Sequence, residues 1–112
     1  MINQTLNYPL STVVVTGGEP LMWNMEYLTK CLKQKGFDTH LETSGTHKLS
    51  GDWDWICLSP KKFQEPLTAI KPLANELKII VSNSHDFKWA ESQRKGVSDH
   101  CKLYLQPEWS KR

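Results

Sequence analysis

Two glycines and an acid after a run of valines form the most distinctive chemical feature of the chain. Residues 12–21 read TVVVTGGEPL, so that Gly17 and Gly18 end the valine run and Glu19 precedes a proline. Glycine permits a positive φ and has no Cβ to hold a ligand away from the backbone. Pro20 keeps the residue before it extended. Carbonyl oxygens beside a carboxylate suit a small cation such as an ammonium group. We therefore predict cation binding at this turn.

Other polar side chains follow the next predicted strands, at the point where each strand ends. They are Glu42 and Thr43, Ser59 and Lys61, and Gln106, and they join Thr16, Gly17, Gly18 and Glu19 of the first turn. In parallel α/β folds, ligands bind at the carboxyl ends of the strands. The sequence therefore predicts one ligand site at one edge of a sheet.

Hydrophobic patterning predicts the elements that position these groups. Strands are expected at 12–16, 37–43, 53–58, 77–81 and 102–105, and helices at 24–35 and 86–95. A short helix within 66–75 is a weaker prediction because Pro72 would interrupt it. The alternation of strands and helices predicts an α/β chain with a mostly parallel sheet.

Two packing predictions follow from residue types. The β-branched run at 12–16 is typical of a strand buried on both faces. In the first helix, Met25, Leu28 and Leu32 recur at helical spacing, so we expect them to pack on the sheet.

Composition limits the classes of function. At 112 residues the chain is one domain at most, and its net charge of +2 is scattered rather than gathered into a basic patch, which argues against nucleic-acid binding. No window is long and apolar enough to cross a membrane, and residues 1–10 lack the pattern of a signal peptide. A cytoplasmic protein that binds neither nucleic acid nor membrane is expected.

The cysteines and histidines show no metal-binding pattern. Cys31, Cys57 and Cys101 are far apart, so we expect three small buried hydrophobic residues rather than a zinc or redox motif. The four histidines lack ligand spacing. We assign no metal ligand and no catalytic residue.

Five segments together carry a resemblance to a known family. VVVTGGEPL (13–21), LETSGT (41–46), LSPK (58–61), ELK (76–78) and YLQP (104–107) resemble, in order and spacing, the radical S-adenosylmethionine superfamily and within it the 7-carboxy-7-deazaguanine synthases of queuosine biosynthesis. The resemblance implies a partial (β/α) barrel, incomplete at both ends. It also implies a single partial domain over 1–112, with an N-terminal loop at 1–11 and a core at 12–109.

The resemblance assigns roles to the candidate residues. Gly17, Gly18 and Glu19 would hold the methionine ammonium of S-adenosylmethionine, and Glu42 would meet its ribose. Ser59 and Lys61 would lie along the cofactor, and Gln106 close to its adenosine end. Trp109, just after Gln106 and Pro107, is expected to be a packing residue rather than one that lines the cofactor edge. Thr16 and Thr43 would face the substrate.

The resemblance also implies a reaction and its partners. Members are lyases that use S-adenosylmethionine, a [4Fe–4S] cluster and magnesium to convert 6-carboxy-5,6,7,8-tetrahydropterin to 7-carboxy-7-deazaguanine. The cluster and cofactor carry the chemistry, while the protein orients them. Expected partners are the small-molecule pterin, a reductant such as flavodoxin or ferredoxin, and a second copy of the chain in a homodimer.

The sequence departs from the family in the residues that hold its metal centres. Members hold the cluster through three closely spaced cysteines upstream of the Gly-Gly-Glu turn, whereas every cysteine here lies downstream of it. The threonine that contacts magnesium has no counterpart either. The resemblance therefore implies a truncated chain that carries the S-adenosylmethionine cradle but is inactive alone. Two alternatives stay open: a cluster-free module that binds S-adenosylmethionine or a purine, and an inactive truncated product.

Overall fold

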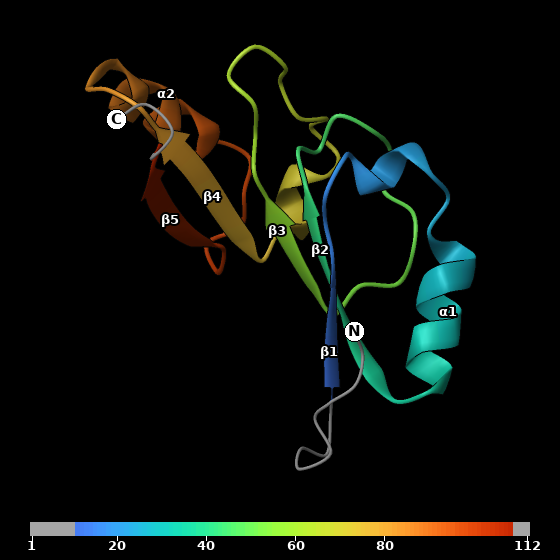
Figure 1. The fold of residues 1–112 in the computed structure, drawn as a ribbon. Helices are drawn as coiled ribbons and strands as arrows, with labels where there is room; N and C mark the ends of the chain where they lie inside the picture. The colour runs from blue at the N-terminus through green and yellow to red at the C-terminus, as the bar shows by residue number, and fades with distance from the viewer. Residues whose placement is uncertain (1–10, 109–112) are drawn as a thin grey trace.

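A five-stranded parallel sheet organises the chain in the computed structural model, which describes residues 11–108 (Figure 1). The elements in order are β1 (Ser11–Val15), the 3-10 turn η1 (Pro20–Met22), α1 (Glu26–Gln34), β2 (Phe37–Thr43), β3 (Trp55–Leu58), the 3-10 turn η2 (Lys71–Leu73), β4 (Glu76–Val81), α2 (His85–Gln93) and β5 (Lys102–Pro107). The predicted α/β class and parallel sheet are confirmed. The predicted N-terminal loop, apart from Ser11, and Trp109 lie outside the described residues.

The strands lie side by side in sequence order, and all four neighbouring pairs are parallel. Their carboxyl ends therefore meet at one edge of the sheet. β1 is an outer strand, and the Val14 side chain is 57% exposed. The prediction that the valine run is buried on both faces is wrong, because within the described chain helices pack on only one face of β1 and its neighbours.

The two faces of the sheet differ in chemistry. Alternate side chains of β2, β3 and β4 pack with the helices and turns into one core: Leu41, Ile56, Leu58, Leu77 and Ile79, together with Leu21, Ile70, Ala74 and Ala90. The intervening positions face the other way and carry a mostly polar set: Asp38, His40, Glu42, Trp55, Cys57, Glu76, Lys78 and Ile80. Since side chains alternate along a strand, this second face is polar and bears the charged groups of the candidate site.

Of the three residues predicted to pack on the sheet, Met25 and Leu32 are half-buried and Leu28 is exposed, while the fully buried residue of the first helix is Thr29. Thr29 is fully buried, whereas Leu28 is 42% exposed. The prediction for Leu28 is therefore wrong. The cause is polar: the Thr29 hydroxyl donates to the Met25 carbonyl and accepts from the Asp52 backbone N–H at 2.9 Å. The first bond lies within the helix, and the second joins the helix to the loop before β3 with Thr29 on the buried side and Leu28 on the exposed side.

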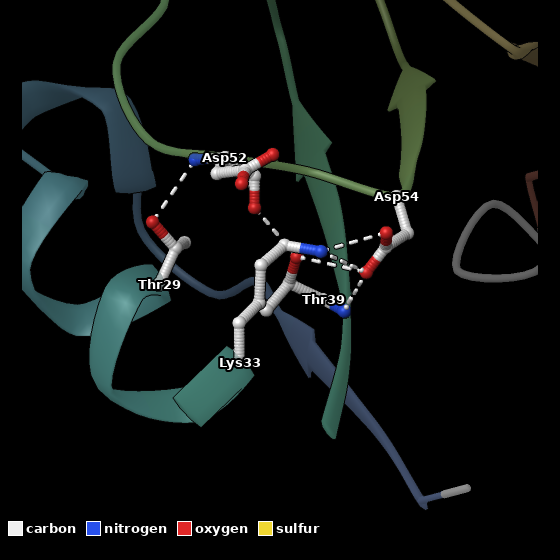
Figure 2. Close-up of polar contacts among 5 residues, drawn as sticks. All are labelled: Thr29, Lys33, Thr39, Asp52 and Asp54. Carbon is white, nitrogen blue, oxygen red and sulfur yellow. Dashed lines mark hydrogen bonds and ion pairs between the residues drawn. The ribbon is translucent and has the colours of Figure 1, made fainter. Parts of the chain in front are cut away.

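Figure 2 shows how this contact extends across the sheet. Lys33 of α1 bonds both carboxylate oxygens of Asp54 at 2.7 Å, and Asp54 accepts the backbone N–H of Thr39 in β2 at 2.8 Å. The Thr39 hydroxyl donates to the Asp52 carbonyl at 2.6 Å. The loop before β3 is thus fixed to both α1 and β2, although it contains no helix of its own.

Several predicted boundaries shift. Trp53 lies before β3 rather than in it, and the 66–75 segment forms only the three-residue turn η2, as expected from Pro72. The last strand continues through Gln106 and Pro107, so Gln106 lies within β5 and not after it. The cysteine prediction holds for Cys57 alone, because Cys31 and Cys101 are only half-buried.

The Thr29 contact can be tested by stability. Thr29→Val keeps the side-chain shape but removes the oxygen that accepts the Asp52 N–H. We expect the free energy of unfolding to fall by about 1–3 kcal/mol, the cost of leaving a donor without its partner, as measured by urea denaturation. Thr12→Val, at an exposed position of β1, should change it by less than about 0.5 kcal/mol. A Thr29→Val protein as stable as the wild type would contradict this role.

Candidate functional site

One pocket lies where the carboxyl ends of the first four strands meet. Its volume is about 380 Å³, within the usual range for small-molecule sites. The lining residues are Thr16, Gly17, Gly18, Glu19, Glu42, Thr43, Ser44, Ser59, Lys61, Lys78 and Ile80. The structure thus brings together every site residue predicted from the sequence except Gln106.

The Gly-Gly turn forms one wall of the pocket and leaves it open. Gly17 has a φ of 89°, a backbone conformation that residues other than glycine rarely adopt. A Cβ added at Gly17 or Gly18 would meet no atom within 4 Å. The glycines are therefore not required by packing inside the chain. They keep space clear next to the exposed backbone of the turn.

The Glu19 carboxylate joins this turn to the end of β2. One oxygen accepts the Leu21 backbone N–H at 3.0 Å and the Thr43 hydroxyl. The other accepts the backbone N–H and the hydroxyl of Ser44, both at 2.9 Å. Four donors fill the usual capacity of a carboxylate. A bound cation would therefore meet the carbonyl groups of the turn, with the Glu19 charge close behind them.

These hydrogen bonds also lower the pKa of the Glu19 carboxyl group. Partial burial alone would raise its pKa, but the hydrogen bonds from Thr43, Ser44 and Leu21 together outweigh burial and lower the pKa below the ordinary value of 4.5. Glu19 is therefore ionised at neutral pH and holds its donors as a charged acceptor.

A second carboxylate, Glu42, lies in the same pocket between a hydroxyl and an ammonium group. It accepts the Thr16 hydroxyl at 2.8 Å and forms an ion pair with Lys78. The Lys78 hydrogen bond is the largest cause that lowers the pKa of Glu42, and the same bond raises the pKa of Lys78. Both groups are charged at neutral pH.

Strand register explains why these three side chains meet. Val15 pairs with Leu41, which sets the next residue, Thr16, beside Glu42. Glu42 pairs with Cys57, so Lys78 must reach across β3 to form its ion pair. The small Cys57 side chain leaves room for this crossing. Burial, followed by the charges of Glu76 and Glu42, raises the pKa of the Cys57 thiol to about 12, so the thiol stays protonated.

The remaining predicted residues lie on either side of the ion pair. Ser59 donates its backbone N–H to the Thr43 carbonyl at 2.7 Å, and Lys61 forms an isolated β-bridge with Gln64. Gln106 lines an adjoining hollow on β4 and β5, which shares only Lys78 with the main pocket. Gln106 is therefore next to the pocket rather than in it.

The sequence predictions missed three lining residues: Ser44, Lys78 and Ile80. Lys78 had a readable signal, because a lysine between Leu77 and Ile79 interrupts an otherwise apolar strand. Ser44 lies within the LETSGT segment (41–46) that carries the family resemblance, and Ile80 had no signal beyond its nearness to a strand end.

The described chain contains no group of three or more His, Cys, Asp or Glu side chains that could hold a metal ion. Cys31, Cys57 and Cys101 come from α1, β3 and the segment before β5, and none lines the pocket. These residues do not fit an iron–sulfur cluster or magnesium. Among residues 11–108, no helix has the length and apolar character needed to cross a membrane.

Two curated proteins that are similar to this chain carry the same enzyme name. No protein-family model matches the chain. It is 50% identical over 109 residues to the 7-carboxy-7-deazaguanine synthase of Synechocystis sp., covering 97% of this chain and 52% of that protein. It is also 50% identical over 101 residues to the enzyme of that name from Flavobacterium psychrophilum, covering 90% and 48%.

A solved structure agrees. The crystal structure of QueE from Escherichia coli superposes with a TM-score of 0.80 at 32% identity, covering 90% of this chain and 47% of that one. The chain thus spans about half the length of the curated relatives it matches.

The Glu19 clamp can be tested with a neutral side chain. Glu19→Gln replaces one acceptor oxygen by an NH₂ group that faces donors, so we expect the free energy of unfolding to fall by about 1–3 kcal/mol at neutral pH. Because folding lowers the pKa of Glu19, the carboxylate stabilises the fold above pH 4.5 and loses this effect as pH falls further. The difference in free energy of unfolding between the wild type and Glu19→Gln, measured by denaturant titration, should therefore become smaller below pH 4.5. A difference that does not change with pH would contradict the stabilising role of the hydrogen bonds that Glu19 accepts.

The Glu42–Lys78 pair can be tested by titration. In Lys78→Met we expect the pKa of Glu42 to rise toward 4.5, because its largest lowering cause is gone. The carboxyl ¹³C signal of Glu42, followed by NMR against pH, measures this. Lys61→Met, which removes a different pocket lysine, serves as the control and should leave the pKa of Glu42 in place. An unchanged titration in Lys78→Met would show that the pair does not form in solution.

Proposed function

We propose that this chain is part of a 7-carboxy-7-deazaguanine synthase, and that its pocket is the S-adenosylmethionine cradle of a radical lyase in queuosine biosynthesis. The proposal is supported by the 50% identity to two proteins of that name, over about half of their length. That enzyme would convert 6-carboxy-5,6,7,8-tetrahydropterin to 7-carboxy-7-deazaguanine. The observation that carries the proposal is the gathering of three separate strand ends, at Glu19, Glu42 and Ser59, around one cavity of ligand size.

The Gly-Gly turn would hold the methionine end of the cofactor. Its backbone is open to the pocket, and neither glycine is required by internal packing. Carbonyl groups there would accept hydrogen bonds from the ammonium group. Glu19 would bring a negative charge close to that ammonium and, through its bonds to Thr43 and Ser44, fix the distance between the turn and β2.

The other lining residues would hold the nucleoside end and the substrate. Glu42, kept ionised by Lys78, is an acceptor for ribose hydroxyls. Ser59 and Lys61 would lie along the cofactor. Gln106, which lines the adjoining hollow, would lie at the adenosine end of the cofactor. Thr16 and Thr43 would face the substrate.

The described residues assign no step to a metal centre. A [4Fe–4S] cluster would supply the electron that cleaves S-adenosylmethionine, but residues 11–108 offer no ligand set for it or for magnesium. What this chain would do is bind and orient the cofactor and keep water from it. We propose in addition that the sheet is part of a (β/α) barrel, and that the whole enzyme works in the cytoplasm as a homodimer with a flavodoxin or ferredoxin reductant.

A second candidate function is favoured by the same missing ligand set. The chain would then be a cluster-free module that binds S-adenosylmethionine or a purine without cleaving the cofactor. An inactive truncated product is the third case. Binding of S-adenosylmethionine separates the first two from the third. Because residues 11–108 offer no cluster ligands, the first and second are separated by joining the chain to the cluster-binding segment of a relative: formation of 5′-deoxyadenosine after reconstitution with iron, sulfide and dithionite supports the first, and its absence supports the second.

The cradle can be tested with one added methyl group. Gly18 is outside the positive-φ region and its added Cβ would meet nothing within 4 Å, so Gly18→Ala should fold with unchanged thermal stability. By titration calorimetry we expect its Kd for S-adenosylmethionine to rise about tenfold or more, because a methyl group that intrudes on a packed contact costs roughly 1–3 kcal/mol.

Gly36→Ala is the matched control. It places alanine at a φ of 88° at the end of α1, far from the lining residues, so it should lose stability and keep affinity. Absence of S-adenosylmethionine binding by the wild type, or equal affinity in Gly18→Ala, would contradict the cradle.

A further inference from the structure

The loop between β3 and η2 carries pocket residues on a segment with little packing of its own. Figure 1 shows it rising beyond β3, between α2 and the ends of β1 and β2. Its ends are fixed to the segment after β2, since Ser59 N–H bonds the Thr43 carbonyl at 2.7 Å and Leu67 N–H bonds the Gly45 carbonyl at 2.8 Å. Between them, residues 61–65 are all exposed. Pro60 and Pro66 on either side are buried, and Gln64 N–H bonds the Lys61 carbonyl at 3.1 Å, so apolar burial holds the two ends of the loop but not residues 61–65 between them.

Two side chains of α2 contact this loop instead. Asp86 forms an ion pair with Lys62, and the Gln93 amide nitrogen donates to both carboxylate oxygens of Glu65 at 3.2 and 3.4 Å. Asp86 and Gln93 are seven residues apart, so they lie two turns apart on one face of the helix. The loop is thus attached at two points to a single helix face.

That face of α2 is unusual in composition. Its buried residues are Asp86, Ala90 and Gln93, and Asp86 and Gln93 are only 1% and 2% exposed. Burying a charge or an amide costs free energy unless the group has partners. Asp86 also accepts the Ser82 and Asn83 backbone N–H groups at 2.6 and 3.3 Å. These two bonds orient the carboxylate independently of Lys62.

We propose that Asp86 and Gln93 form a latch on α2 that holds the 59–66 loop, through Lys62 and Glu65, so that Lys61 stays at the pocket. These four are positioning residues. The consequence for ligand affinity rests on the proposed function, whereas the effect on the loop does not. The latch adds a role for α2, a helix that contributes no residue to the pocket lining.

The first test measures the loop without any ligand. Lys62→Gln breaks the ion pair by changing its exposed partner. The hydrogen bonds from the Ser82 and Asn83 backbone to the buried Asp86 stay intact. We expect faster hydrogen exchange of the backbone amides of 61–65, measured by mass spectrometry, and recovery in Lys62→Arg. Lys88→Gln, an exposed lysine on α2, is the control for loss of one charge. Unchanged exchange in Lys62→Gln would overturn the latch.

The second test asks whether Lys62 acts through Lys61. With S-adenosylhomocysteine as the probe, we expect Lys62→Gln to weaken binding by about 2- to 5-fold, the size of a partly exposed ion pair, and Lys62→Arg to restore it. In a Lys61→Gln background the same change should have no further effect, since coupled residues are not additive. Additive losses would overturn the positioning role. If the wild type does not bind the probe, the proposed function fails, and the exchange measurement alone decides the latch.

Discussion

The candidate site depends on one carboxylate that is used by the chain itself. Glu19 accepts hydrogen bonds from Leu21, Thr43 and Ser44, and so joins the turn after β1 to the end of β2. The pairing of β1 with β2 and the Thr16–Glu42 hydrogen bond place the start of the Gly-Gly turn beside Glu42, and the Glu19 link holds the other end of the turn to Thr43 and Ser44. The acid that the sequence marks as a ligand for a cation thus has a structural role as well: it spaces the carbonyl groups and the second carboxylate so that one molecule could contact both.

The remaining polar groups follow from register on a parallel sheet. Because β1, β2, β3 and β4 run in the same direction, Thr16, Glu42, Ser59 and Lys78 reach the same edge. The polar face of the sheet brings Lys78 across the small Cys57 to Glu42. This pairing neutralises two charges at a half-buried position, where either alone would be costly. It also leaves the pocket with an acceptor that stays ionised at neutral pH.

Sequence patterns predicted the sheet and most of the pocket because both depend on local signals. The strand at Phe37–Thr43 has the predicted bounds, and the glycine turn requires a positive φ at Gly17. The errors arise where distant contacts decide. Leu28 matches a helical apolar stripe, yet the bond between Thr29 and Asp52 joins the helix to the loop before β3 with Leu28 on the exposed side. Pro107 suggested an earlier strand end, but β5 is an outer strand, where a missing N–H is tolerated. The ion pair of Lys78 depends on cross-strand register, which no single segment encodes.

The most direct test of the account is to map S-adenosylmethionine on the chain by ¹H–¹⁵N NMR. We expect addition of the ligand to shift the backbone amide signals of Gly17, Gly18, Ser44 and Ser59 together, with one common Kd. Signals of Glu26 and Lys30, which line a separate hollow beside α1, should stay in place. Shifts confined to that hollow, or no shift at the Gly-Gly turn at saturating ligand, would contradict the claim that these strand ends form a cofactor cradle.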